Sequence, residues 1–153
     1  MHLSEVLNPD MFWPNLGAKT KPEVIRELSE KISVIAGNID AKKITEILME
    51  RERLGSTGIQ DGIAIPHGKV PGLEKIILAC GISNDGIDFD SHDQKPTKIF
   101  FVLLAPEFAA GQHLKVLARL SKLLKEERIR EELISAEEGA KMYNFILKED
   151  EQS

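Results

Sequence analysis

Ile99-Phe100-Phe101-Val102-Leu103-Leu104-Ala105 is the stretch of this chain that decides its fold. Every side chain in it is apolar, so a strand formed here has two apolar faces. Such strands lie at the centre of a sheet that is covered on both sides. The segment Ile76–Ile82 has the same character and is predicted to be a second central strand.

A shorter extended segment, Ile63–Ile65, leads into Pro66, His67 and Gly68. Proline cannot donate to a sheet ladder, so this strand is expected to end at Pro66. Gly68 allows a sharp turn or the close approach of another molecule. His67 is therefore expected where a rigid strand passes into a surface loop, a common position for reactive groups. The alternative is a strand-end histidine that only hydrogen-bonds a loop.

Helical patterns lie on both sides of the strand region in the sequence. Thr20 and Glu23 have the spacing of a capping box, and Gly37 is placed to end the helix that they begin. Leucines at helical spacing follow the last strand. The predicted helices span residues 20–37, 40–55, 111–124 and 136–147.

The remaining segments carry weaker signals. Residues 1–20 are expected to be irregular but docked on the body of the protein. Turn residues at 84–86 and 91–93 are expected to flank a weak strand at 87–89. The acidic end of the chain, about residues 148–153, is expected to be a mobile tail.

The order of these elements indicates the fold class. Helices come first, then strands, then helices again, which is an α+β-like order within the α/β class. The 153 residues suffice for one domain with its own core. The sequence therefore predicts a single domain over residues 1–153, with a mixed parallel and antiparallel β-sheet flanked by helices on both faces.

Composition excludes several classes of function. The formal net charge of -5 argues against nucleic acid as a partner, because phosphate binding needs a dominant basic patch. No apolar run reaches the roughly 18 residues of a membrane span, so no membrane insertion is expected. The amino terminus lacks the pattern of a signal peptide. The single cysteine, Cys80, fits a reducing compartment, and a cytoplasmic protein is expected.

His113 occupies a helical position where an apolar residue is expected. It shares one face with Leu117, Leu120 and Leu124. It also lies in the first turn, where the helix dipole favours anions and disfavours an imidazolium. A neutral histidine there is suited to donate a hydrogen bond to a phosphoryl oxygen. A core histidine with satisfied hydrogen bonds is the alternative.

Arg51 also interrupts an apolar helix face. It follows Ile44, Ile47 and Leu48 at the spacing where another apolar side chain is expected. A cation near a helix C-terminus complements the dipole, but Arg53 can do this from the solvent side. An inward arginine near a catalytic loop more readily indicates anion recognition, because its planar fork matches phosphate or carboxylate.

No metal site and no cofactor are predicted. His92 lies between Asp90 and Asp93, a spacing that can hold a metal ion. Turns are often built from such residues without any ion, so this cluster is interpreted as a turn. No nucleotide-binding motif is complete.

Four segments of the chain together are similar to one family. They are Arg51-Glu52, Ser56-Thr57-Gly58-Ile59, Gly62-Ile63-Ala64-Ile65-Pro66-His67-Gly68 and His113-Leu114. In these segments the chain resembles the fructose/mannitol-type (type 2) enzyme IIA family of the bacterial phosphoenolpyruvate-dependent phosphotransferase system, which includes the nitrogen-regulatory IIA proteins. The resemblance covers nearly the whole chain, and its most specific part is the Pro-His-Gly signature.

The resemblance implies a role for each candidate residue. His67 would carry the phosphoryl group as phosphohistidine, with Nε2 suggested as the modified atom. His113 matches the second active-site histidine, and Arg51 the arginine that supports the site. Thr57 and the backbone around Gly68 are expected to add hydrogen bonds to the phosphoryl group. The donor would be the small carrier HPr or its nitrogen-pathway homologue, with a IIB domain or regulated target proteins receiving the group or responding to it.

Two roles stay open within the family. One is a regulatory phosphocarrier whose phosphorylation state controls other proteins, which the free-standing length favours. The other is the IIA component of a fructose- or mannitol-type sugar transporter. A hypothesis of another class is a binding module on the same fold that does not transfer phosphate.

Overall fold

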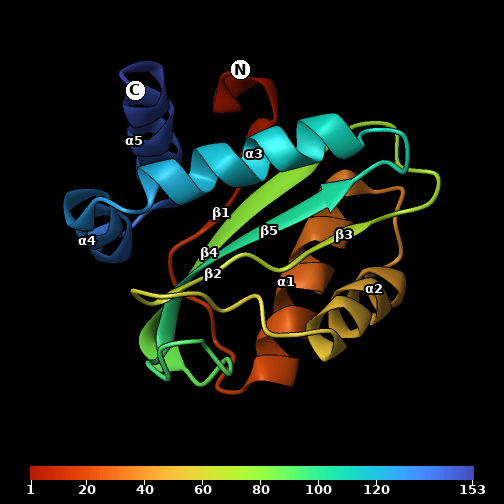
Figure 1. The fold of residues 1–153 in the computed structure, drawn as a ribbon, viewed down its shortest axis with the longest axis horizontal. Coiled ribbons are helices and arrows are strands. Elements are labelled where there is room, and N and C mark those ends of the chain that lie inside the picture. Colours follow the sequence, from red (N-terminus) through yellow and green to blue (C-terminus); the bar gives the residue numbers. More distant parts are fainter.

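Five strands form one mixed sheet, and helices cover both of its faces (Figure 1). The computed structural model describes residues 1–153. The strands are β1 (Leu7–Trp13), β2 (Ile63–Ala64), β3 (His67–Lys69), β4 (Ile77–Ile87) and β5 (Thr97–Ala105). The helices are η1 (Leu3–Glu5, a 3-10 helix), α1 (Lys21–Ala36), α2 (Ala41–Arg53), α3 (Ala110–Leu123), α4 (Glu127–Ser135) and α5 (Gly139–Glu151). The predicted fold class is confirmed.

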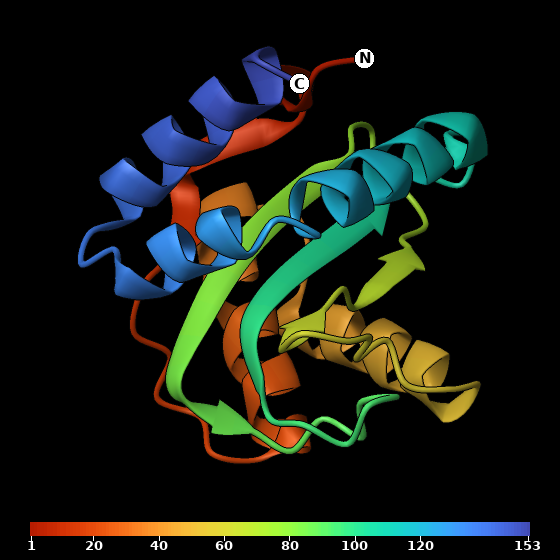
Figure 2. The same cartoon turned by 60° about the vertical axis from the view of Figure 1, so that its left-hand side comes forward.

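The long strands β4 and β5 form the centre of the sheet. They pair antiparallel, β1 runs parallel to β4, and β2 and β3 run parallel to β5. Alternate side chains of β5 from Ile99 to Ala105 pack under α3, α4 and α5, while those from Phe100 to Leu104 pack against α1 and α2. Figure 2 shows these two groups of helices on opposite sides of the central strands. The all-apolar sequence of β5 is therefore buried on both faces, as predicted.

Beside β5, the short strands β2 and β3 form one interrupted edge. Ile63 pairs with Ile99 and His67 with Leu103, so both strands keep the same register. The prediction that the strand ends at Pro66 is wrong in part, because pairing resumes at His67. Proline lacks an N–H group, but its carbonyl still accepts a bond from Leu103 N at 3.0 Å, which keeps the edge in line.

Strand β1 corrects the expectation that residues 1–20 are irregular. It pairs with β4 with a register shift between Leu7 and Phe12. Because β1 is an edge strand, Pro9 does not break a ladder on its open side.

Strand β4 is longer than predicted. It continues through residues 84–86 to Ile87, where a turn was expected, and its pairing is irregular between Ile82 and Ile87. Gly86 has a φ of 81°, so the turn-forming residues make a bulge within the strand. The prediction of a separate weak strand at 87–89 is therefore wrong.

Helix α1 begins and ends at the residues that the sequence patterns predicted, whereas the helices near the C-terminus differ from the prediction. Thr20 Oγ1 accepts a bond from Glu23 N, and Gly37 ends α1 with a left-handed φ of 75°. Helix α4 was not predicted, and α5 extends to Glu151. The prediction of a mobile tail at about residues 148–153 is wrong for most of that segment, because it belongs to α5 and Asp150 is fully buried. No helix in the protein is long and apolar enough to cross a membrane.

Candidate functional site

Helix α2, strand β3 and the first turn of α3 surround an open pocket of about 610 Å³. These three segments lie toward the right in Figure 1. The lining of the pocket includes Arg51, His67, Gly68, Lys69 and His113. Four of these residues were predicted from the sequence, although they come from three separate segments. The fold therefore brings both histidines and the arginine to one cavity.

His67 begins β3 and is half-buried. Its Nδ1 lies 2.7 Å from the carbonyl oxygen of Ile65. A carbonyl can only accept, so the neutral ring that makes this bond carries its hydrogen on Nδ1. The lone pair is then on Nε2, which makes Nε2 the nucleophilic atom. The sequence predicted His67 at the end of a strand, where it passes into a surface loop; in the structure His67 is the first residue of the short strand β3.

His113 faces His67 from α3. The two rings lie edge to face, with centroids 5.4 Å apart and an interplanar angle of 78°. His113 is 8% exposed, and its Nε2 is buried without a hydrogen-bond partner. This unpaired nitrogen argues against a satisfied core histidine, since buried polar atoms are nearly always bonded.

The surroundings of His113 favour its neutral form. Burial lowers the pKa of His113, and the positive charges of protonated His67 and of Lys69 lower this pKa further. A neutral imidazole keeps one N–H donor and avoids placing a second positive ring beside His67.

Arg51 enters the pocket from the last turn of α2. Its Nη1 donates to the carbonyl oxygen of Gly55 at 2.9 Å, which anchors the guanidinium in the turn after the helix. Its other N–H groups make no hydrogen bond within the chain, so they are available to an anion. The inward position that the sequence predicted is consistent with the place of Arg51 in the pocket lining.

Gly68 allows α2 to pack directly on β3. A Cβ atom at this position would lie 2.5 Å from Ile47 Cγ2, closer than such atoms can approach. Because Gly68 has no side chain, α2, and Arg51 with it, can lie close to the strand that carries His67.

The structure does not bring Thr57 into the pocket. Thr57 is 5% exposed, and its hydroxyl donates to the carboxylate of Glu52. It is not among the pocket-lining residues. The expected direct hydrogen bond from Thr57 to a phosphoryl group forms no part of the function proposed below.

Lys69 also lines the pocket, although the sequence patterns did not single it out as a candidate. It is exposed and follows His67 by two positions in β3, so both side chains extend from the same face of the strand. That two-residue spacing in an extended segment is the signal that identifies it in the sequence.

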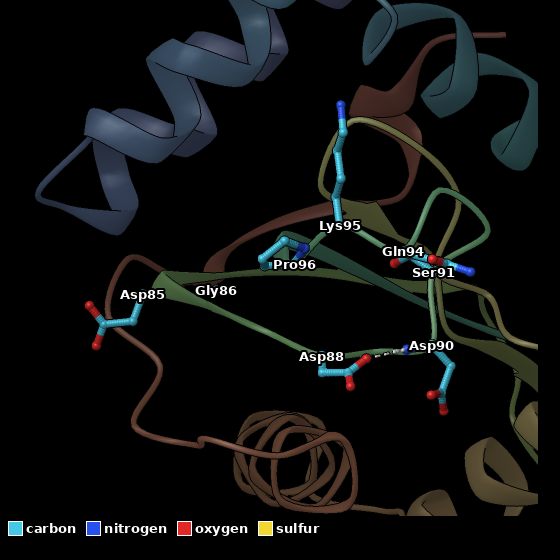
Figure 3. A pocket seen from close by; sticks show the side chains of 8 residues that line it. All are labelled: Asp85, Gly86, Asp88, Asp90, Ser91, Gln94, Lys95 and Pro96. Atoms are coloured by element: carbon cyan, nitrogen blue, oxygen red, sulfur yellow. Dashed lines mark hydrogen bonds between the residues drawn. The ribbon is translucent and has the colours of Figure 1, made fainter.

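A second hollow, of about 650 Å³, lies near the end of β4 and has a different character (Figure 3). Asp85, Asp88 and Asp90 supply its carboxylates, and Lys95 extends away from Asp88 and Asp90. With three acids and no histidine, this hollow is unsuited to a phosphoryl group. No group of three or more histidine, cysteine or acidic side chains in the protein is arranged to hold a metal ion.

Comparison with known proteins accounts for this combination of fold and pocket. The family model described as "Phosphoenolpyruvate-dependent sugar phosphotransferase system, EIIA 2" matches residues 5–149. The chain belongs to this EIIA 2 family. The resemblance found in the sequence is thus confirmed.

Similar proteins carry two kinds of name. The nitrogen regulatory protein of Bradyrhizobium diazoefficiens is 36% identical over 146 residues, which cover 95% of this chain and 95% of that protein. The PTS system fructose-specific EIIABC component of Bacillus subtilis is 35% identical over 150 residues, which cover 98% of this chain and 24% of that protein. The crystal structure of nitrogen regulatory protein IIA-Ntr from Neisseria meningitidis has a TM-score of 0.87 at 29% identity, covering 94% of this chain and 98% of that one.

Proposed function

We propose that this EIIA 2 protein is a phosphocarrier that accepts a phosphoryl group on Nε2 of His67. The donor is a phosphorylated HPr-type carrier, either HPr or its nitrogen-pathway homologue. The bond of 2.7 Å between Nδ1 and the Ile65 carbonyl carries this proposal, because it leaves the Nε2 lone pair free. A neutral imidazole nitrogen needs no general base to act as the nucleophile.

The transfer exchanges one P–N bond for another. Nε2 of His67 attacks the phosphorus in line with the donor imidazole, and the electron pair of the breaking bond returns to that imidazole. Positive charge that develops on the His67 ring is stabilised through Nδ1–H by the Ile65 carbonyl. Arg51 and an N–H of His113 stabilise the charge on the equatorial oxygens. This chemistry requires neither metal nor cofactor.

The biological role that we propose is nitrogen regulation. It is supported by the Bradyrhizobium and Neisseria relatives, which match this chain over nearly their whole length. A second candidate is the IIA component of a fructose- or mannitol-type transporter, which passes the group to a IIB domain. The Bacillus relative favours this candidate, since its name combines EIIA with B and C components. We place either role in the cytoplasm, where the buried thiol of Cys80 stays reduced.

The test is reconstitution with phosphoenolpyruvate, enzyme I and either HPr or the nitrogen-type carrier. We expect mass spectrometry to show one added phosphoryl group, located on His67. Addition of a fructose- or mannitol-type IIB domain then distinguishes the two roles, because only a transport component is expected to lose its label rapidly to that domain. Failure to acquire label from either carrier would instead favour a binding module that does not transfer phosphate.

Replacement of His113 tests its role in stabilising the transferred group. We expect His113→Ala to slow single-turnover transfer about a hundredfold, the effect typical of removing one preorganised hydrogen-bond donor. Lys122→Ala, at an exposed position near the end of the same helix, is the control and is expected to react like the wild type. Thermal unfolding of both variants checks that the fold is intact. Wild-type kinetics in the His113→Ala protein would assign His113 to core packing.

Titration of His113 provides an independent check on the electrostatics. The pKa of His113 is lowered in the folded state. The contribution of neutral His113 to the free energy of unfolding is therefore complete above about pH 6.5, and it is lost as the pH falls through the folded pKa. We expect NMR titration to place the His113 pKa below the usual histidine value. Replacement of His67 by Ala should raise the pKa of His113, since one positive neighbour is removed. A His113 pKa at or above the usual value would contradict this electrostatic account.

A further inference from the structure

Glu52 is a buried acid that takes no direct part in the proposed phosphoryl transfer. It lies in the last turn of α2, beside Arg51, and its side chain is 3% exposed. Its carboxylate accepts bonds from the backbone N of Thr57 at 3.0 Å and from the Thr57 hydroxyl. Lys21 Nζ lies 3.0 Å from the same carboxylate. Acids are rarely buried unless they are paired in this way.

The position of Glu52 is unfavourable for α2 itself. The C-terminal end of a helix carries partial negative charge, which an additional carboxylate opposes. The ion pair with Lys21 does not explain why the acid lies here, because Lys21 also has Asp90 at 3.4 Å and the Phe89 ring at 4.6 Å. A locally unfavourable residue of this kind points to a functional constraint.

The contacts of Glu52 continue to His67 through the backbone. The carbonyl oxygen of Thr57 accepts a bond from Ile65 N at 3.1 Å, and the carbonyl oxygen of Ile65 is the partner of His67 Nδ1 at 2.7 Å. An antiparallel bridge between Gly58 and Ala64 joins the two segments between these points. Thr57 is thus one end of a hairpin whose other end sets the Ile65 carbonyl against the histidine.

We propose that Glu52 is a positioning residue for phosphoryl transfer. By holding both donors of Thr57, its carboxylate fixes the hairpin that places the Ile65 carbonyl opposite His67 Nδ1. That placement selects the tautomer with its lone pair on Nε2. The proposal rests on the phosphocarrier function, but the tautomer of His67 is measurable in the unphosphorylated protein.

The same turn also holds Arg51, which gives Glu52 a second route to the pocket. Arg51 Nη1 donates to Gly55 O, and Glu52 binds Thr57, two residues further along. Adjacent residues of α2 thus hold the segment after the helix at two points. Release of Thr57 would loosen the support of both the nucleophile and the guanidinium.

The central variant is Glu52→Gln. An amide can accept bonds from Thr57, but it removes the negative charge that pairs with Lys21 and places an NH₂ group among donors. We expect ¹⁵N NMR of the unphosphorylated protein to change from one His67 tautomer, protonated on Nδ1, to a mixture of both. We also expect single-turnover transfer to slow by between about tenfold and a hundredfold, as small misplacements of reacting groups do.

Two further variants separate positioning from loss of stability. Thr57→Val removes the hydroxyl donor but keeps the backbone bond to Glu52, and is expected to give a smaller effect of the same kind. Asp150→Asn makes the same acid-to-amide change at a fully buried carboxylate outside the pocket, which accepts bonds from Leu3 N and Arg119 Nε, and it controls for a comparable loss of stability. We expect it to leave both the tautomer and the rate unchanged.

The outcomes decide between the proposals. A Glu52→Gln protein with the wild-type tautomer and the transfer rate of Asp150→Asn would overturn the positioning role. If Glu52→Gln fails to fold, an unchanged tautomer and rate in Thr57→Val would overturn it equally. If wild-type protein accepts no phosphoryl group, the phosphocarrier function fails, while a mixed tautomer in the variants would still support positioning of His67 by Glu52.

Discussion

A His67→Ala protein is expected to acquire no phosphoryl group from a phosphorylated HPr-type carrier. Under the same conditions the wild type should be fully labelled, so the expected effect is complete loss. The physical reason is that Nε2 of His67 is the nucleophile, and alanine offers no atom that can form the new P–N bond. His113 is not expected to substitute, since it is 8% exposed and its Nε2 is buried.

The control for this experiment is His92→Ala. His92 is exposed and lies outside the pocket, so its loss should leave labelling unchanged. Intact-mass spectrometry at short reaction times measures the labelling, and thermal unfolding checks the fold of each variant. His67 is half-buried and makes one side-chain hydrogen bond, so its replacement should cost only about 1 kcal/mol of stability. Labelling of His67→Ala at the wild-type rate would end the assignment of His67 as the acceptor.

The sequence indicated the pocket because its main residues disturb regular patterns. Arg51 and His113 each take an apolar position in a helix, and His67 follows an apolar strand. Periodicity predicts which face of an element is buried, so a polar residue on that face is visible without a structure. The same reasoning predicted β5, whose apolar residues leave no face for solvent.

The support behind the pocket could not be predicted in this way. The link from Glu52 through Thr57 and Ile65 depends on a hairpin that is held by backbone bonds between residues 57–65. Such bonds leave no periodic pattern of side chains. Thr57 was expected to contact the phosphoryl group, whereas in the structure its hydroxyl donates to Glu52.

The errors at the two chain ends have a common physical origin. β1 and the end of α5 become ordered through contacts with distant parts of the chain, which local composition does not reveal. Leu3 N donates to Asp150 Oδ2 at 2.7 Å across 147 positions of sequence. The acidic terminal segment was predicted to be mobile, but Asp150 within it is fully buried and bonded to Leu3 N and Arg119.

Replacement of Asp150 by alanine is expected to have the largest effect on stability. Asp150 is fully buried, and Arg119 Nε donates to its Oδ1 at 2.6 Å. Alanine would leave Arg119 Nε and Leu3 N without their acceptor, although Arg119 Nη2 keeps its bond to the backbone oxygen of residue 150. We expect the free energy of unfolding to fall by about 3 kcal/mol, the lower end for a broken buried pair, because the Arg119 side chain is 18% exposed and can regain water. The melting temperature should fall by about 6–12 °C.

Glu151→Ala is the matched control, because Glu151 is exposed in the same helical turn and forms no ion pair. Its free energy of unfolding should stay within about 0.5 kcal/mol of the wild type. Denaturant unfolding of the three proteins, with the slopes compared, separates a change in stability from a change in the unfolded state. Equal stability of Asp150→Ala and Glu151→Ala would mean that the C-terminal segment contributes nothing to the folded protein, and that the original expectation of a mobile tail is correct. The expected difference would instead establish that this end of α5 joins α3, and through Leu3 the N-terminal segment, into the folded core.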